Sequence, residues 1–290
     1  MAKHVVKILE QPVLRSPRMV MGFSGWMDGG DASTGTVKYL TEKFNARELA
    51  EIDPERFYIY NFPGSMEISS FFRPHTSIED GLITTFEEPA NKFYFSEPDD
   101  LILFEGKEPN LRWQQYADCI FSVAAEFHVT KIYFVGSVSS VVPHTRETRF
   151  HGSVSDERLK PDLLDNHGIF FSNYEGPASF VTYMMVQSRL KGLPMTSLVA
   201  EIPGYVQGRN EKCIEAIVRK LAAILGLAAD FDDMKAGSRQ FEKRLNQVLE
   251  DRPELADLLR KLEQDFDGDV QGDYPDDLEQ WFDKQGLRFN

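Results

Sequence analysis

The strongest constraint on the fold is a regular alternation of two patterns between Arg18 and about Leu227. Short apolar runs rich in β-branched and aromatic residues alternate with longer segments whose apolar residues recur every three or four positions. The first pattern is typical of buried strands and the second of amphipathic helices. This order predicts an α/β fold in which helices cover a mostly parallel sheet.

The same patterns place individual elements along the chain. Apolar runs predict strands at residues 19–23, 56–60, 82–86, 92–95, 100–104, 132–136 and 196–202. The helical spacing predicts helices over residues 32–44, 113–127, 176–190 and 213–225. The run at 101–104 is apolar at every position, which is typical of a central parallel strand.

The composition changes after Leu227. Residues 228–290 carry 17 acidic and 9 basic side chains, so they hold more than half of the net charge of −14. We therefore expect a core domain over residues 1–228 and a small acidic helical extension over residues 229–290. The helix stripes of this extension are Phe241, Leu245, Val248 and Leu249 and, after Pro253, Leu255, Leu258, Leu259 and Leu262. Because this apolar surface is small, we expect the extension to be separable from the core.

Charge and cysteine content limit the partners and the compartment. An acidic surface argues against general binding to nucleic acid or to anionic lipid, so small molecules or proteins are the expected partners. Cys119 and Cys213 lie on predicted helix faces and give no disulfide framework. The N-terminal residues lack the apolar core of a signal peptide, and no run reaches the length of a membrane span. A cytoplasmic location is expected.

Five polar or glycine-rich loops follow predicted strands, at residues 25–30, 105–109, 143–146, 173–177 and 203–205. The carboxyl ends of parallel strands lie along one edge of a sheet, so these loops are expected to converge on a pocket there. The candidate ligand-binding residues on them are Trp26, Asp28, Glu105, His144, Arg146, Tyr174, Glu175 and Tyr205.

Among these loops, Pro143-His144-Thr145-Arg146 has the most side chains able to bind a ligand or take part in catalysis. It places an imidazole, a hydroxyl and a guanidinium within four residues, shortly after the apolar run at 132–136. The competing interpretation is that His144 stabilises a turn and Arg146 is a solvated surface charge. Both interpretations remain open at this point.

Alternatives also remain open for the other loops. Trp26 is either a packing residue at the pocket rim or a direct ligand contact. Glu105 belongs either to a carboxylate pair for acid/base work or to a charge cluster at a helix start. Glu175 is either a ligand contact or an acid in the first turn of a helix.

Several more specific catalytic, nucleotide-binding and metal-binding motifs are absent from the sequence. Gly22-Phe23-Ser24-Gly25 lacks the spacing of a nucleophile elbow, and nothing resembles a zinc-protease HExxH motif. No GxGxxG motif or Walker lysine accompanies Gly29 and Gly30. The acidic residues at 265–269 do not form a calcium loop, because Val270 occupies the position that requires glycine. The sequence therefore predicts neither a metal site nor a cofactor.

Taken together, the loop motifs resemble the proteasome assembly chaperone family of the second-subunit type, in its bacterial branch. The resemblance covers about residues 18–228. It rests on Gly25-Trp26-Met27-Asp28-Gly29-Gly30, Glu105-Gly106-Lys107-Glu108-Pro109 with Arg112-Trp113, Pro143-His144-Thr145-Arg146, Tyr174-Glu175-Gly176-Pro177 and Ile202-Pro203-Gly204-Tyr205-Val206.

The resemblance implies a three-layer α/β/α core similar to nucleoside phosphorylases, a cytoplasmic protein and a homo-oligomer. It implies no reaction. Where members of this family carry a Pro-His-Tyr element, this chain has Gly204 between Pro203 and Tyr205. His144 is therefore the remaining imidazole on these loops.

Two functions follow from these observations. In the first, the chain is an oligomeric binding or assembly protein that engages a protein segment or a small ligand at the carboxyl edge of the sheet. In the second, it is a hydrolase or transferase acting on a nucleoside-like or amide-like molecule. There His144 acts as general acid/base, Arg146 holds an anionic group, and Asp28 or Glu175 orients the substrate. We favour the first.

Overall fold

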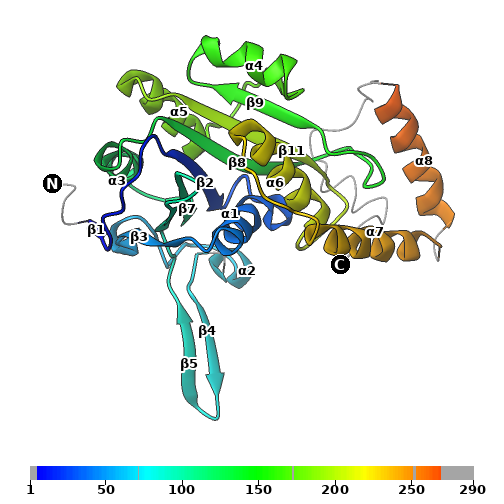
Figure 1. The fold of residues 1–290 in the computed structure, drawn as a ribbon. Helices are drawn as coiled ribbons and strands as arrows, with labels where there is room; N and C mark the ends of the chain where they lie inside the picture. Colours follow the sequence, from blue (N-terminus) through cyan, green and yellow to red (C-terminus); the bar gives the residue numbers. More distant parts are fainter. Residues whose placement is uncertain (1–4, 71, 172, 251–252, 269–290) are drawn as a thin grey trace.

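The computed structural model describes residues 5–70, 72–171, 173–250 and 253–268 (Figure 1). Its centre is a nine-stranded sheet with the strand order β1-β3-β6-β7-β2-β8-β11-β9-β10. The strands are β1 (Val6–Ile8), β2 (Arg18–Ser24), β3 (Arg47–Ile52), β6 (Lys92–Ser96), β7 (Leu101–Lys107), β8 (Lys131–Ser140), β9 (Phe150–Val154), β10 (Phe170–Phe171) and β11 (Met195–Pro203).

The middle of the sheet is parallel, as the apolar runs predict. Strands β7, β2, β8 and β11 run in the same direction, and β11 pairs with β8 along its whole length. The flanking strands add antiparallel pairs, with β6 and β3 on one side and β9 on the other. Strands buried on both faces need apolar residues at successive positions, which explains why these four were readable from sequence.

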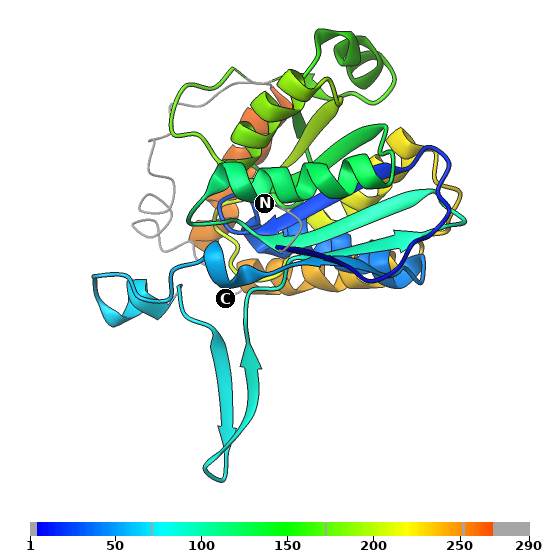
Figure 2. The same ribbon diagram turned by 90° about the vertical axis from the view of Figure 1, so that its left-hand side faces the viewer.

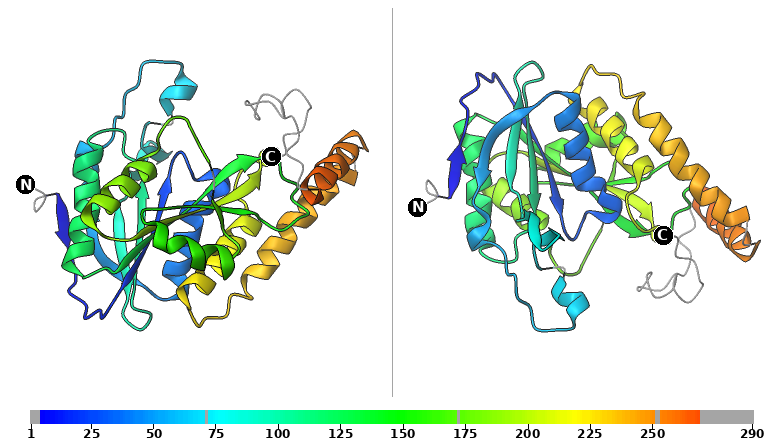
Figure 3. Two further views of the ribbon diagram at one scale, coloured as in Figure 1. Left: turned by 90° about the horizontal axis from the view of Figure 1, so that it is seen from above. Right: turned by 90° about the horizontal axis from the view of Figure 1, so that it is seen from below.

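Helices cover both faces of this sheet (Figures 1 and 3). Helices α1 (Ala32–Lys43) and α6 (Glu211–Leu225) pack on one face, where Val37 and Ile217 belong to one buried apolar cluster. Helices α3 (Trp113–Glu126) and α5 (Phe180–Lys191) pack on the other, where Tyr116 and Phe180 belong to a second cluster. The short helix α4 (Lys160–Asp165) lies near β9 and adds Leu163 to the first cluster. The expected α/β/α architecture is confirmed.

Close packing of α1 on the sheet fixes the loop after β2. A Cβ atom on Gly22 would lie 2.6 Å from the carbonyl oxygen of Ser33, so only glycine permits this approach. The Ser33 hydroxyl accepts a hydrogen bond from Phe23 N at 3.0 Å and donates one to Val135 O. The start of α1 is therefore tied to β2 and β8, and the loop between β2 and α1 has little freedom.

Some expected elements differ from the structure. The strand expected at 56–60 is wrong, because residues 54–56 form a 3-10 turn and the chain then leaves the sheet. The run at 82–86 does form β5 (Leu82–Glu87), but it pairs only with β4 (His75–Glu79) in a separate hairpin that projects from the body (Figure 2). Helix α2 (Met66–Ser70) precedes this hairpin. Helix α5 begins at Phe180 and not at 176, because the Ser179 hydroxyl caps it through Thr182 N at 3.2 Å.

The extension forms two helices, α7 (Met234–Glu250) and α8 (Pro253–Asp267). Helix α7 lies against α6 (Figure 3), and Phe241, Leu245 and the preceding Phe231 are buried. On α8, Leu262 is buried as well. The expected stripe residues Val248, Leu249, Leu255 and Leu258 and the acidic stretch 269–290 lie outside the described residues or side chains. No helix in the described ranges combines the length and apolarity needed to cross a bilayer.

Candidate functional site

His144 lies in the loop after β8 and is buried, with 3% of its surface exposed. Its backbone N donates to the Tyr205 hydroxyl at 2.8 Å, and its Nδ1 lies 2.8 Å from the same oxygen. The amide oxygen of Asn246 can only accept a hydrogen bond, which places the imidazole proton on Nε2 and makes Nδ1 the acceptor of the Tyr205 hydroxyl. Nε2 thus donates to Oδ1 of Asn246 on α7 at 3.1 Å.

The buried surroundings of His144 and Tyr205 favour the neutral form of both side chains. Burial lowers the pKa of His144 below its usual value, and burial raises the pKa of the Tyr205 hydroxyl. Both ring nitrogens are already hydrogen-bonded within the chain. His144 therefore joins the loop to α7 and has no nitrogen left for a substrate.

Arg146 is engaged by α8. Its Nε and Nη2 donate to the two carboxylate oxygens of Asp267 at 2.8 and 2.7 Å, and its Nη1 donates to Glu263 at 3.1 Å. The hydroxyl of Thr145 donates to the same Glu263 oxygen at 2.5 Å. These contacts raise the pKa of Arg146, chiefly through the hydrogen bonds to Asp267. The planar fork that would suit an anionic ligand holds two carboxylates of this chain.

Two further cations complete the junction between this loop and the extension. The guanidinium of Arg149 stacks on the ring of Phe266, 3.7 Å from its centroid, and donates to Phe266 O at 2.6 Å. Lys212 of α6 donates to His144 O at 2.6 Å and to the carboxylate of Glu242 on α7. We call the set formed by residues 144–149, Tyr205, Lys212 and their partners on α7 and α8 the loop–helix junction.

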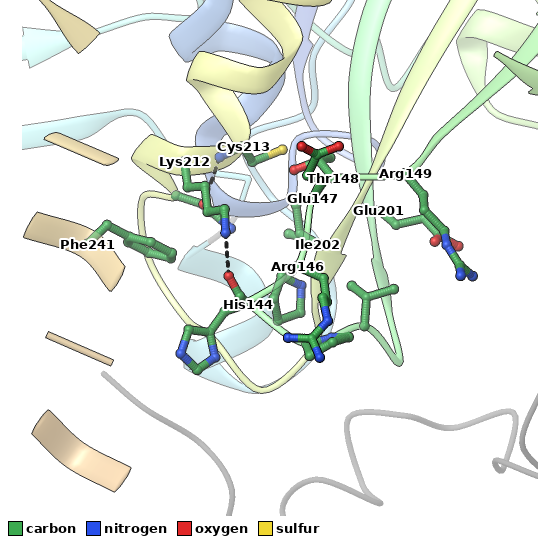
Figure 4. Close-up of a pocket in the computed structure, with 14 residues that line it drawn as sticks. His144, Arg146, Glu147, Thr148, Arg149, Glu201, Ile202, Lys212, Cys213 and Phe241 are labelled. Atoms are coloured by element: carbon green, nitrogen blue, oxygen red, sulfur yellow. Dashed lines mark hydrogen bonds between the residues drawn. The ribbon is translucent and has the colours of Figure 1, made fainter. Parts of the chain in front are cut away.

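The space beside the loop–helix junction is small (Figure 4). A cavity of about 20 Å³ lies between the loop, α6 and α7, and His144, Lys212, Cys213 and Phe241 are among its lining residues. This volume holds about one water molecule. Burial raises the pKa of the Cys213 thiol, so it is not a ready nucleophile. A nucleoside-sized ligand does not fit here.

Asp28 and Glu105 serve the packing of α1. The Asp28 carboxylate accepts from Ser33 N at 2.8 Å and from Thr34 N at 3.0 Å, and thus satisfies two amides in the first turn of the helix. Burial raises the pKa of Asp28 to about 6 against these hydrogen bonds. Glu105 lies 3.3 Å from Lys38 on α1 and does not contact the loop–helix junction.

Trp26, Tyr174 and Glu175 remain exposed. The side chain of Trp26 is 67% exposed and that of Tyr174 is 70% exposed. Their loops are linked by Glu108, whose carboxylate accepts from Trp26 N at 3.0 Å and from Phe180 N at 2.7 Å. The structure thus divides the eight candidate residues into three groups: the loop–helix junction, the α1 contacts and an exposed aromatic edge.

Four residues that organise these groups were not candidates from sequence: Glu108, Asn246, Glu263 and Asp267. Glu263 and Asp267 are four positions apart on one helix, so they lie on the same face. An acidic pair at this spacing, in a chain with a basic loop, is the signal that points to such a contact. Nothing local in the sequence marks Asn246. Among the described residues, no cluster of three His, Cys, Asp or Glu side chains is placed to hold a metal ion.

Solved structures share this fold. A proteasome-assembly chaperone homologue from Mycobacterium tuberculosis is 25% identical, with a TM-score of 0.71 over 83% of this chain and 98% of that chain. A PAC2 family protein from Streptomyces avermitilis is also 25% identical, with a TM-score of 0.68 over 80% and 96%. An archaeal proteasome activator from Pyrococcus furiosus, at 20% identity, shares the fold with a TM-score of 0.61 over 84% and 97%.

The profile of the PAC2 family matches residues 22–249 of this chain. The matched range begins within β2 and ends within the last turn of α7, so it includes both helix layers and the aromatic edge. The resemblance to proteasome assembly chaperones expected from the loop motifs is confirmed by these matches. The chain belongs to the PAC2 family.

Proposed function

We propose that this chain is an assembly factor that binds a segment of a partner protein at the exposed aromatic edge formed by Trp26 and Tyr174. The observation that carries the proposal is the exposure of these two rings on loops that share one anchor, with Trp26 N held in the first loop and Phe180 N held where the second loop enters α5. Both loops are anchored to the single carboxylate of Glu108. Tryptophan and tyrosine side chains have only two rotatable bonds each, so they lose little conformational entropy on binding, and they dominate the energetics of protein interfaces.

The names of two relatives support an assembly role. One is a proteasome-assembly chaperone homologue and another is a proteasome activator. Subunits of a proteasome are therefore the first partners to test. A cytoplasmic location and self-association belong to the same proposal, because they accompany the resemblance to assembly chaperones.

The enzymatic alternative has less support. Its general acid/base, His144, is buried with both ring nitrogens occupied. Its anion-binding group, Arg146, holds two carboxylates of α8. Its orienting group, Asp28, caps α1. Each of these side chains already has a structural contact in this state of the chain.

Site-specific photocrosslinking in the source organism tests the proposal. A photoreactive phenylalanine analogue replaces Trp26 or Tyr174, and the matched control carries it at Phe170, which is 57% exposed on the edge strand β10. We expect one crosslinked partner at the first two positions and none at the control. The partner, purified, should then lose affinity for the double variant Trp26→Ala/Tyr174→Ala.

Three results would count against the proposal. The same crosslinks at Phe170, or none at either test position, would remove the aromatic edge as a binding surface. Turnover of a nucleoside or amide by the purified chain, abolished by His144→Ala in a folded variant, would favour the enzyme instead. A genome that encodes no proteasome subunits would exclude a proteasome as the partner.

A further inference from the structure

The hairpin of β4 and β5 projects away from the body of the protein (Figures 1 and 2). Its strands pair only with each other, and nearly all of their residues are exposed. A lone two-stranded hairpin is at best marginally stable in water. This hairpin therefore has the character of an arm that gains stability from a partner.

A bulge gives the hairpin one apolar face. Ile78 pairs with Ile83, whereas Thr76 pairs with Phe86, and the register shifts between these pairs. The extra residue in β5 lets Ile83 and Phe86, three positions apart, lie on the same face as Ile78. These three side chains are 62%, 68% and 60% exposed, in the order Ile78, Ile83 and Phe86. Such a patch marks an interaction surface.

The charges around this face have one sign. The segment 74–91 contains no lysine or arginine, and its four carboxylates lie at the tip and the base of the hairpin: Glu79, Asp80, Glu87 and Glu88. A partner that covers the apolar face must also tolerate these charges. The complementary surface is therefore apolar and bordered by cations.

The chain itself presents such a surface at the end of α5. Val186 and Leu190, one helical turn apart, are 53% and 75% exposed. Arg189 and Lys191 lie in the same last turn. Beyond the helix end is an open hollow of about 770 Å³, lined by Arg189 and Leu193 and also by Glu157 and the ion pair of Arg158 with Asp156. The cations that border Val186 and Leu190 are therefore Arg189 and Lys191, of which Lys191 also lies 3.3 Å from Asp118 on α3.

The two surfaces lie at opposite edges of the sheet. The hairpin belongs to the segment that follows the carboxyl end of β3, which is parallel to β7 through two successive antiparallel pairings. The end of α5 instead precedes the amino end of β11. Figures 1 and 2 show the hairpin and α5 on opposite sides of the body. The hairpin therefore cannot reach α5 of its own chain.

We propose that the β4–β5 hairpin of one copy docks on the α5 end of a second copy, with its apolar face against Val186 and Leu190 and its acidic tip against Arg189 and Lys191. The contact joins two different surfaces, so it is head-to-tail and produces a closed ring or a chain of copies. It rests on the self-association proposed above, but it does not use the aromatic edge at Trp26 and does not depend on partner binding there.

Charge reversal tests the contact. The mass of the full chain is measured by light scattering after size exclusion, for Glu79→Lys/Asp80→Lys and for Arg189→Glu/Lys191→Glu. We expect the unchanged protein to be oligomeric and each double variant to be monomeric at the same concentration. The quadruple variant restores opposite charges at the contact and should regain the original mass. Glu55→Lys/Glu126→Lys, a reversal at exposed positions on other elements, is the control and should remain oligomeric.

Three results would overturn the proposal. If the protein without substitutions is monomeric at high micromolar concentration, the two copies do not form this contact. An oligomer that survives both reversals assembles through another surface. Loss of assembly in the hairpin variant without rescue in the folded quadruple variant shows that the arm binds something other than α5.

Discussion

The Nε2 atom of His144 lies 3.1 Å from Oδ1 of Asn246, which joins a loop of the core to the C-terminal extension across 102 positions of sequence. The same loop binds α8 through Arg146. A segment that resembles a ligand site in sequence is thus the place where the chain binds its own acidic helices. Side chains of the extension therefore occupy the hydrogen-bonding groups of His144 and Arg146.

Replacing His144 with alanine should lower the free energy of unfolding by about 2–4 kcal/mol, because it leaves a cavity and removes the hydrogen bonds to Tyr205 and Asn246. Urea unfolding followed by circular dichroism measures this. His151→Ala is the control, since that partly exposed histidine lies 3.3 Å from Glu201. It should cost about 1 kcal/mol or less. Equal effects at both positions would refute the structural role of His144.

Arg146→Lys keeps the charge but loses the two-pronged contact with Asp267. We expect faster amide hydrogen exchange throughout α8, with the sheet unchanged. High salt should reduce the difference from the unchanged protein, because the pair is exposed and screened. Arg158→Lys, which weakens a pair with Asp156 only two positions away, should leave exchange in α8 unaltered. Unchanged exchange in α8 of the Arg146 variant would mean that this contact does not hold the helix.

The raised pKa of Asp28 predicts that the stability of the folded chain depends on pH. Its pKa in the folded chain is about 6, raised by burial above the ordinary 3.8. The folded state therefore holds the proton more tightly, and the stabilisation present below pH 4 is lost as the pH rises through 6. Since one pKa unit corresponds to about 1.4 kcal/mol, the loss is at most about 3 kcal/mol.

The variant Asp28→Asn should lack this slope. Free energies of unfolding are measured in urea from pH 4 to pH 7, and the difference between the variant and the unchanged chain is plotted against pH. Asp53→Asn, which alters an exposed carboxylate that accepts from Glu55 N, is the control and should retain the slope. Parallel curves for Asp28→Asn and the unchanged chain would contradict the assignment.

A chain that ends at residue 230 tests whether the extension is separable. Residues 1–228 contain the whole sheet and both helix layers, so we expect a cooperative thermal transition. The transition should lie at a lower temperature, because burial of Phe231, Phe241 and Leu245 is lost, at about 1.5–3 kcal/mol for each side chain. A truncated chain that is insoluble or melts without cooperativity would show that the extension is integral to the core.

Part of the fold could be predicted from the sequence because the patterns that mark it lie among neighbouring residues. The apolar runs that form β2, β7, β8 and β11 are buried on both faces, and the periodicity of α3 and α6 marks one apolar side. Strand β3 was missed because its sequence, Arg-Glu-Leu-Ala-Glu-Ile, mixes charged with apolar residues, although the strand lies inside the sheet between β1 and β6. Arg47 and Glu48 at its start are exposed, so the sequence shows neither the continuous apolar run of a central strand nor a regular alternation.

The same distinction between local sequence signals and long-range packing applies to the candidate site. The sequence by itself determined the α/β alternation, the acidic extension and the family motifs, because each is a pattern among neighbouring residues. Only the tertiary structure decided that His144 faces Asn246, that Arg146 faces Asp267 and that Trp26 remains exposed. These outcomes depend on which distant surfaces pack together. Burial and long-range hydrogen bonds set whether a polar side chain supports the fold or meets a partner.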